Sequence, residues 1–403
     1  MRILFLTDNF PPEVNAPATR TYEHCVEWVK LGAEVTVITC FPNFPKGKIY
    51  NGYQNKLYQK EIIDGIRVIR VWSYMSPNTG FVKRVFDFMS YAFMAFLLGV
   101  FQKCDLIIGT TPQFFTAISA SCLAFIKRRP WVMEVRDLWP ESIVAVGAMK
   151  RQDLAFKFLR KIEIKLYHSA NLIIVVTDQF KKYISSLSVV SSKIFIIKNG
   201  VIHSNFIPSN KNNQLLEKHG LTGKFIVSYI GTHGMAHALD FILNCANTIK
   251  DPKIHFILQG DGSEKQHLME IAAQLNLKNI TFLPFVSKSE ISKYINLSDV
   301  ALVNLKRSET FKTVIPSKIF ENVALYKPIL LGVEGEAKDL IEHYKVGVCY
   351  IPESQSSFIE ALEEIKSYKT PDFELNCNEM LQQFDRNKFA SIMLDVITKT
   401  LHK

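Results

Sequence analysis

The sequence predicts an α/β protein made of two doubly wound, parallel-sheet domains, and three observations point to this fold class. First, 403 residues are too many for one ordinary core and suit two domains of about 200 residues each. Second, short apolar runs alternate with helix-like segments along the chain. Third, this alternation is interrupted by a polar segment and then starts again, so that each half can form its own sheet.

Seven apolar runs predict the strands of the first domain. They consist mainly of Val, Ile and Leu, as in parallel strands covered on both faces, and they occupy residues 2–7, 34–40, 67–72, 106–110, 131–136, 172–177 and 193–199. Helical patterns lie between several of them, and the pattern over residues 18–32 ends in Gly32, a residue type that commonly stops a helix. A repeated strand–helix order predicts a doubly wound sheet.

The polar segment IPSNKNNQ (residues 207–214) is predicted to link the two domains. The first domain is therefore expected to cover residues 1–206 and the second to begin at residue 207. Six further apolar runs follow the link, at residues 225–231, 254–260, 280–285, 300–305, 327–332 and 347–351. Because ligands bind at the carboxyl ends of the strands in such sheets, we expect a site in a cleft between the domains.

Charge is concentrated in the first half of the chain. Residues 1–200 carry 26 Lys and Arg against 15 Asp and Glu, whereas the whole chain has a net charge of +10. A positive half-molecule implies an anionic partner: nucleic acid, a phosphorylated substrate or an acidic membrane. Nucleic acid is the least favoured, because the sequence has no zinc-finger spacing and no aromatic RNA-binding motif.

The cysteines and the first residues indicate the compartment. Seven cysteines are scattered without a CxxC pair, which does not suit a disulfide framework and predicts a reducing environment. The opening MRILFLTDNF lacks the basic region, the length and the cleavage site of a signal peptide. We therefore expect a cytoplasmic protein.

One segment, residues 81–103, departs from the strand–helix pattern. Its apolar run from Phe88 to Phe101 has 14 residues, fewer than the roughly 20 that span a bilayer. Basic residues flank the run at both ends. A core helix and a helix at a membrane interface both remain open, and the positive charge of this half favours contact with the inner face of the cytoplasmic membrane.

Two motifs of the first domain end predicted strands in polar residues. The loop NFPPEVNAPATR (9–20) has a proline-rich turn and then a helix, and it holds the candidates Glu13, Asn15, Ala16 and Arg20. It contains no GxGxxG, which argues against a dinucleotide dehydrogenase. An ordinary strand–helix loop is the alternative.

The second motif of the first domain is WVMEVRDLWPES (131–142). Charges at the end of a buried strand are costly unless they are paired or functional. Asp137 is therefore a candidate for contact with the acceptor or the reacting sugar, and Arg136 is a candidate beside it. A structural pair of Arg136 and Asp137 is the alternative.

In the second domain, YIGTHGMAHALD (229–240) is predicted to bind phosphate. A strand ends at Gly231, Thr232, His233 and Gly234, and a helix is expected to begin there. The glycines would allow the backbone to approach a phosphate, and the helix start would donate N–H groups to it. His233 or His237 could add a charge or a hydrogen bond, although a solvated loop histidine is the simpler alternative.

The segment FKTVIPSKIFENVALYKPIL (311–330) carries the strongest chemical pattern. Pro316 and Ser317 open a helix on which Lys318 and Glu321 share one face. The lysine can neutralise a diphosphate and the glutamate can accept two ribose hydroxyls. The alternative is an exposed ion pair worth well under about 1 kcal/mol. Two weaker turns, LQGDGSEK (258–265) and FVSKSEI (285–291), follow other strands.

These motifs together resemble glycosyltransferase family 4, and specifically its bacterial O-antigen and capsule branch. The similarity extends over nearly the whole chain and is greatest to WbuB-type N-acetyl-L-fucosamine transferases. It implies a GT-B fold, in which two Rossmann-like domains face each other across a cleft, and a hexosyltransferase activity. It also implies that residues from about 386 to 403 return to the first domain, so that the second domain covers 207–385.

The resemblance further implies the reaction and its participants. A sugar would move from UDP-N-acetyl-L-fucosamine to a sugar on undecaprenyl diphosphate, with retained configuration, in O-antigen or lipopolysaccharide assembly. No metal or cofactor would be needed, and the sequence has no Asp-x-Asp motif. The first domain would bind the acceptor and contact the membrane through about residues 81–103.

The resemblance also assigns the donor contacts. The residues from Gly231 to Gly234 would lie beside the phosphates and Glu321 beside the ribose. The base would lie between two segments, which contain Gly260, Gly262, Phe285, Val286 and Lys288.

Two departures from the family pattern matter for the site. The family often has two glutamates separated by seven residues, and Thr313 stands where the first is expected. The usual Arg and Lys after the first glycine are replaced in a region that holds Thr232, Ala236 and His237. We expect Lys318 to compensate, with Lys318, His233 and the helix start stabilising the leaving diphosphate. A UDP-sugar 2-epimerase and a non-catalytic nucleotide-sugar-binding subunit are the alternatives.

Overall fold

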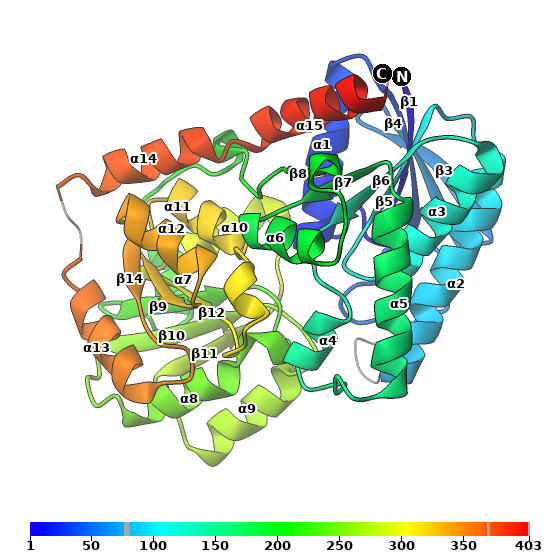
Figure 1. The fold of residues 1–403 in the computed structure, drawn as a ribbon. Helices are drawn as coiled ribbons and strands as arrows, with labels where there is room; N and C mark the ends of the chain where they lie inside the picture. The colour runs from blue at the N-terminus through cyan, green and yellow to red at the C-terminus, as the bar shows by residue number, and fades with distance from the viewer. Residues whose placement is uncertain (76–80, 369–370, 402–403) are drawn as a thin grey trace. The chain divides into compact units, whose positions relative to one another are not determined.

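The computed structural model describes residues 1–75, 81–368 and 371–401, and this part of the chain forms two α/β units (Figure 1). The first unit contains residues 1–199 and the C-terminal segment that begins at Arg386. The second unit contains residues 200–385. Each unit is built on one sheet, so the predicted division into two parallel-sheet domains is confirmed.

The first unit has an eight-stranded sheet in the order β3-β4-β2-β1-β5-β6-β7-β8. Its strands are β1 (Arg2–Leu6), β2 (Glu34–Cys40), β3 (Tyr58–Ile63), β4 (Ile66–Val71), β5 (Leu106–Thr110), β6 (Trp131–Val135), β7 (Leu172–Val175) and β8 (Ile194–Ile196). Only β3 pairs in antiparallel fashion, with β4, and the sequence analysis missed it. The segment YQKEII lacks a continuous apolar run because one of its faces is exposed at the edge of the sheet.

Helices on both faces of this sheet enclose its core. They are α1 (Ala16–Lys30), α2 (Phe81–Val100), α3 (Phe115–Lys127), α4 (Glu141–Ala145), α5 (Leu154–Ser169), α6 (Asp178–Ser186) and α15 (Arg386–Leu401). The buried core includes Phe5, Trp28, Val37, Ile108 and Val132. Because the strands are covered on both faces, they read as uninterrupted apolar runs in the sequence.

The C-terminal helix α15 packs on α1 within the first unit. The Trp28 indole N–H donates to the carbonyl of Ala390 over 2.8 Å. Arg386 forms a buried ion pair with Glu23 of α1. These contacts hold the last helix on the first unit, whereas residues 402–403 of the predicted segment lie outside the described residues.

The boundary between the units lies after Asn199, earlier than the predicted residue 206. Val201 explains this difference, because its N–H donates to the carbonyl of Phe384 over 3.0 Å and it forms a bridge with Asp385. Phe206 is also buried. Pairing with the end of the second unit therefore assigns residues 200–206 to that unit, and hydropathy alone did not reveal this pairing.

The second unit has a six-stranded parallel sheet in the order β11-β10-β9-β12-β13-β14. Its strands are β9 (Phe225–Ile230), β10 (Ile254–Gln259), β11 (Ile280–Leu283), β12 (Val300–Asn304), β13 (Ile329–Gly332) and β14 (Gly347–Cys349). Its helices are α7 (Asn213–Lys218), α8 (Leu239–Thr248), α9 (Lys265–Gln274), α10 (Lys288–Ile295), α11 (Lys318–Ala324), α12 (Glu336–Tyr344), α13 (Gln355–Ile365) and α14 (Phe373–Gln383). Tyr229, Phe256, Leu302 and Phe358 belong to its core.

Helix α2 is buried on one side and exposed on the other. Tyr91 and Ala95 belong to the buried side. The exposed side carries a row of large apolar residues at helical spacing, which we name the α2 stripe: Phe86, Met89, Phe93, Leu97 and, just beyond the helix end, Phe101. The core-helix interpretation is therefore wrong for this side. No described helix is long and apolar enough to cross a membrane, and the side chains of Phe81 and Val82 lie outside the described residues.

Candidate active site

In the second unit, two loops at the carboxyl ends of β9 and β10 are joined through their backbones. The N–H of Gly231 donates to the carbonyl of Gln259 over 2.9 Å, and the N–H of His233 donates to the carbonyl of Asp261 over 2.9 Å. Glu264 returns a bond from its N–H to the carbonyl of His233, also over 2.9 Å. The predicted phosphate loop is thus held by its neighbour, which makes its backbone a defined surface.

The glycines of the second loop are required by this close packing. A Cβ atom on Gly260 would lie 1.8 Å from the carbonyl oxygen of Gly231, and one on Gly262 would lie 2.3 Å from that of His233. Both obstacles are backbone atoms, which cannot rotate away. Gly260 and Gly262 therefore shape the phosphate loop, and a contact of either with a nucleotide base stays a prediction.

Lys318 provides a buried positive group beside the phosphate loop. It is the first residue of α11, and its Nζ lies 3.6 Å from the centre of the Tyr229 ring. The Nζ is buried and has no hydrogen-bond partner among the described residues. Burial lowers the pKa of Lys318 to about 7, while the nearby Glu321 acts in the opposite direction. The charge of Glu321 thus offsets only part of the desolvation of this ammonium.

The structure brings Lys318 and Gly231 together. The Nζ atom lies 2.9 Å from the point where a Cβ on Gly231 would stand. Tyr229 supports both residues, because its ring lies under the ammonium and its hydroxyl donates to the carbonyl of Thr232 over 2.7 Å. A glycine turn with a lysine against it forms a surface that suits an anion.

The helix expected directly after this loop begins later than predicted. Residues Met235–His237 form a single 3₁₀ turn, and α8 starts only at Leu239. Ala238 lies between them in the left-handed backbone conformation, with φ of 42°, which interrupts the helical hydrogen bonding. The proposed role of a helix start at 231–236 is therefore wrong.

His233 is buried and is not a positive group at neutral pH. Its ring lies 5.9 Å from that of Tyr229 and 6.4 Å from that of Phe282. Burial lowers its pKa to about 4, and the charges of Lys265 and Lys318 lower it further. Of the two roles considered for His233, a positive charge is wrong, because burial favours the neutral imidazole, and a hydrogen bond to a ligand stays a prediction.

The remaining donor candidates lie in three places: before α11, in the phosphate loop after β9, and in the loop after β11. Ser317 is the residue before α11, and the carbonyl of Pro316 accepts the N–H of Ile319 over 3.2 Å in the first turn. Gly234 belongs to the phosphate loop, whereas Phe285 is an exposed residue of the loop that contains Val286.

Thr313, which replaces the expected first glutamate, closes a local turn. Its hydroxyl donates to the carbonyl of Thr310 over 2.6 Å. This bond lies within the segment that precedes α11. The hydroxyl thus contributes to the shape of the segment.

In the first unit, Arg20 lies in the interior. Its guanidinium forms an ion pair with Glu134 over 3.0 Å and donates to the carbonyls of Ile197 and Lys198 and to the side chain of Asn199. Only 1% of Arg20 is exposed. The expectation that Arg20 contacts a sugar is wrong for this arrangement, because the donors of the guanidinium bind the chain itself.

Glu13 is also turned inward. Its carboxylate accepts the N–H groups of Asn43 and Phe44, each over 2.8 Å. Burial raises its pKa to about 7. These bonds hold the loop after β2 in place, so the structure does not support the predicted contact of Glu13 with an acceptor.

Asn15, Ala16 and Arg136 meet at the start of α1. The Asn15 side chain caps this helix by accepting the N–H of Ala18 over 2.9 Å. Arg136, which follows β6, donates to the carbonyl of Ala16 over 3.1 Å and to that of Pro17 over 3.2 Å. Arg136 therefore joins the ends of β6 and of the first loop.

Asp137 is a carboxyl group with an altered proton affinity at the carboxyl edge of the first sheet. Burial raises its pKa to about 6, and the neighbouring Ser142 and Leu138 moderate the rise. Its N–H donates to the hydroxyl of Thr111 over 3.3 Å. Such a shift is typical of functional sites, and the role of Asp137 stays a prediction.

Comparison with known families covers both halves of the chain. Residues 15–200 match the glycosyl transferase 4-like domain, and residues 211–387 match the glycosyl transferases group 1 domain. A WcaI glycosyl transferase assigned to colanic acid biosynthesis in Escherichia coli K12 is 25% identical over 90% of this chain and 92% of its own. The chain is a GT-B glycosyltransferase of family 4.

Solved structures agree with this fold. Anabaena HepE in complex with UDP has a TM-score of 0.68 and 14% identity, over 99% of this glycosyltransferase and 100% of HepE. WaaG, a glycosyltransferase involved in lipopolysaccharide biosynthesis, has a TM-score of 0.71 and 12% identity, over 98% of this chain and 99% of WaaG. At these identities the comparison establishes the fold alone.

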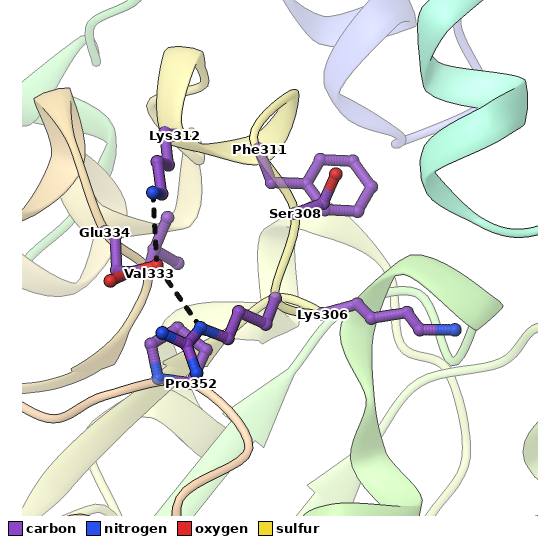
Figure 2. A pocket seen from close by; sticks show the side chains of 8 residues that line it. Lys306, Ser308, Phe311, Lys312, Val333, Glu334 and Pro352 are labelled. Atoms are coloured by element: carbon purple, nitrogen blue, oxygen red, sulfur yellow. Dashed lines mark ion pairs between the residues drawn. The ribbon is translucent and has the colours of Figure 1, made fainter.

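The glycosyltransferase has a shallow surface hollow at the carboxyl ends of β12 and β13, lined by residues such as Arg307, Lys312 and Glu334. The Oε2 atom of Glu334 lies 3.8 Å from the Nε of Arg307 and 3.8 Å from the Nζ of Lys312. Figure 2 shows the Lys306 side chain pointing away from the pair of Lys312 and Glu334. None of the predicted donor-binding residues lines this hollow.

Two residues were not predicted from the sequence, one in each unit. Tyr229 lies inside the predicted strand 225–231, and its ring lies under Lys318. Asp8 follows β1 in the first unit, and burial raises its pKa. Its position after the first strand was the available signal. The described residues contain no group of three His, Cys, Asp or Glu that could hold a metal ion.

Proposed function

We propose that this glycosyltransferase moves a hexosyl group, N-acetyl-L-fucosamine, from its UDP derivative to a sugar carried on undecaprenyl diphosphate. The reaction retains the anomeric configuration and uses no metal ion. The product belongs to O-antigen or capsule assembly. The relative WcaI supports this polysaccharide setting, because it is assigned to colanic acid biosynthesis.

The buried Nζ of Lys318 is the observation on which the donor site depends. It lies against the Gly231 loop and on the Tyr229 ring, without a hydrogen bond. A diphosphate placed there would supply the missing counter-charge and would accept N–H groups of the loop. HepE, which has the same fold, was solved with UDP and with UDP-glucose.

This arrangement stabilises the leaving group of a glycosyl transfer. The bond between the anomeric carbon and the phosphate oxygen breaks, and a bond between that carbon and the acceptor oxygen forms on the same face. The acceptor proton moves to the departing phosphate oxygen, so that charge is balanced. Negative charge grows on the diphosphate in the transition state, where a fixed ammonium contributes most.

The α2 stripe supports a place at the inner face of the cytoplasmic membrane. Beyond the stripe, the end of α3 exposes Phe125 and Ile126, and the Lys127 ammonium joins the two helices by donating to the carbonyl of Val100 over 2.8 Å. Exposed Arg128 and Arg129 follow directly. Aromatic residues next to basic ones suit an interface with anionic lipid.

A transfer assay tests the proposed function. Radiolabelled UDP-sugars, including UDP-N-acetyl-L-fucosamine, are incubated with the purified protein and a membrane lipid fraction. We expect label in the lipid with UDP-N-acetyl-L-fucosamine and an unchanged anomeric configuration by NMR, also in the presence of EDTA. Conversion of the UDP-sugar without an acceptor would instead identify an epimerase, and UDP binding without any reaction would identify a non-catalytic subunit.

A further inference from the structure

The first sheet has its topological switch point between β1 and β5. From β1, the chain continues in one direction through β2 and β4, and in the other through β5, β6, β7 and β8. In open parallel sheets, ligands bind outside the carboxyl ends of the strands at such a point. The residues that follow β1 and β5 therefore occupy the position where a ligand of the first unit is expected.

Asp8 stands at this position on a fixed backbone. Its carbonyl accepts the hydroxyl of Thr39 over 3.2 Å and the thiol of Cys40 over 2.8 Å. The side chains of Asn9 and Gln113 lie beside its carboxyl and lower its pKa, against the larger effect of burial, which raises it. Because Gln113 follows β5, this carboxylate spans the two strands of the switch point.

Gln113 is itself held, so the position of the carboxylate is defined. Its side-chain oxygen accepts the N–H of Thr116 over 3.1 Å at the start of α3. Its amide nitrogen donates to the hydroxyl of the same threonine. Gln113 is thereby held beside Asp8, which is itself partly exposed.

The charge around Asp8 does not account for its burial. The positive charges of Arg136 and Arg84 favour the ionised carboxylate of Asp8, and the negative charge of Glu13 disfavours it. No ion pair to Asp8 occurs in the part of the chain that the structure describes. The carboxylate of Glu134, at the same edge of the sheet, does have such partners: it forms an ion pair with Arg20 and accepts the hydroxyl of Thr110. A partly buried carboxylate without such a partner is costly unless it has a function.

The surroundings of Asp8 suit a sugar. Trp139 lies 5.9 Å from Phe88 and 5.9 Å from Phe114, ring centre to ring centre, and is partly exposed. Phe114 directly follows Gln113, so this aromatic cluster adjoins the switch point. A carboxylate that accepts hydroxyl hydrogens, next to apolar ring surface, is the combination that a pyranose requires.

We infer that Asp8 binds a hydroxyl group of the acceptor sugar at the switch point of the first sheet. This inference rests on the proposed function. The carboxylate accepts the hydrogen of that hydroxyl and orients the sugar, while the reacting proton still passes to the departing phosphate oxygen. Asp8 thereby selects an acceptor that carries a sugar over one that ends in a bare phosphate, which its charge repels.

The test compares Asp8→Asn with Asp105→Asn. Asp105 lies at the opposite, amino edge of the same sheet and pairs with Arg2. The apparent KM for the acceptor is measured by diluting the membrane lipid fraction, and UDP affinity is measured by calorimetry. We expect Asp8→Asn to raise the acceptor KM more than about tenfold and to leave UDP affinity within about twofold, and Asp105→Asn to change neither.

Two results would overturn the inference while leaving the proposed function intact: an unchanged acceptor KM in Asp8→Asn, or an equal rise in both variants. A wild-type protein that transfers to no acceptor would instead contradict the proposed function. If Asp8→Asn does not fold, Asp8→Glu keeps the charge but moves it. An acceptor KM that rises at an unchanged donor KM in Asp8→Glu supports the role, and an unchanged acceptor KM opposes it.

Discussion

Lys318 illustrates how one residue can be unfavourable for folding and useful for binding. Its Nζ is removed from water without a hydrogen-bond partner among the described residues, and it lies over the Tyr229 ring. A cation over an aromatic face recovers part of the lost solvation. The rest of the lost solvation energy can be recovered when an anion binds. Because the ammonium is desolvated when the protein folds, binding of the substrate does not have to desolvate it again.

The first prediction concerns turnover. Lys318→Ala should lower the rate of transfer more than about tenfold, the factor that corresponds to about 1.4 kcal/mol of transition-state stabilisation. The rate is measured with saturating UDP-sugar in the radiolabel assay. Lys338→Ala, which removes a lysine from the surface of α12, serves as the control and should transfer at the wild-type rate. Equal rates in both variants would exclude Lys318 from the site.

The second prediction concerns pH. Because burial lowers the pKa of Lys318 to about 7, the ammonium is charged below that pH and increasingly neutral above it. UDP is fully ionised above about pH 7, since a terminal phosphate has a second pKa near 6. UDP affinity should therefore fall from pH 7 to pH 9, by at most about tenfold per pH unit.

Calorimetry in buffers of different ionisation enthalpy would detect the matching proton uptake. In Lys318→Arg the guanidinium stays charged throughout this range, so the affinity should vary much less with pH. A wild-type affinity that is constant between pH 7 and pH 9 would show that Lys318 is not the titrating group.

At the scale of elements, α2 and α3 together form one apolar surface with a basic end. The helices are joined by the Ser119 hydroxyl, which donates to the carbonyl of Ala92 over 2.6 Å, and by Lys127. Phe101 is 79% exposed and Phe125 is 85% exposed. Large aromatic residues this exposed on a fixed pair of helices suggest a surface that is covered in use.

The third prediction tests this surface with vesicles. Replacing Phe93 and Phe101 by serine should lower the fraction of protein that sediments with anionic vesicles at least about fivefold. The reason is that each phenylalanine ring removes apolar area from water when it enters the membrane interface. Leu375→Ser, at an equally exposed leucine of α14, is the control and should bind like the wild type. Binding that depends only on salt, and not on the phenylalanines, would count against insertion.

At the scale of the molecule, the chain leaves the first unit after Asn199 and re-enters it at Arg386. The returning helix α15 buries Ala390, Met393 and Ile397 completely. The core of the first unit is therefore completed by a helix that follows the whole second unit, residues 200–385, in the sequence. We expect the stability of the first unit to depend on this helix.

The fourth prediction tests this closure. Ile397→Ala should lower the free energy of unfolding of the first unit by about 2–5 kcal/mol, because a fully buried side chain leaves a cavity. Urea unfolding followed by tryptophan fluorescence measures the change. Ile392→Ala, on the exposed side of the same helix, should cost less than about 1 kcal/mol. Similar losses in both variants would mean that α15 is not part of this core.

The architecture could be predicted from local sequence alone: two parallel sheets, every strand except β3, and the approximate positions of the polar loops that follow the strands. These properties are local, because a buried parallel strand must be apolar along its length. The sequence also identified Lys318 and the glycines of the phosphate loop as candidates. It could not assign the orientation of a charged side chain, so it misjudged Arg20, Glu13 and the charge of His233.

Only the tertiary structure decided those orientations. Whether a carboxylate or guanidinium meets solvent, a backbone N–H or an opposite charge depends on segments far away in the chain. Arg20 is neutralised by Glu134 and by residues 197–199, and Asp8 is tethered by Gln113. The same holds for the pKa values, because desolvation is a property of the packed surroundings and not of the residue type.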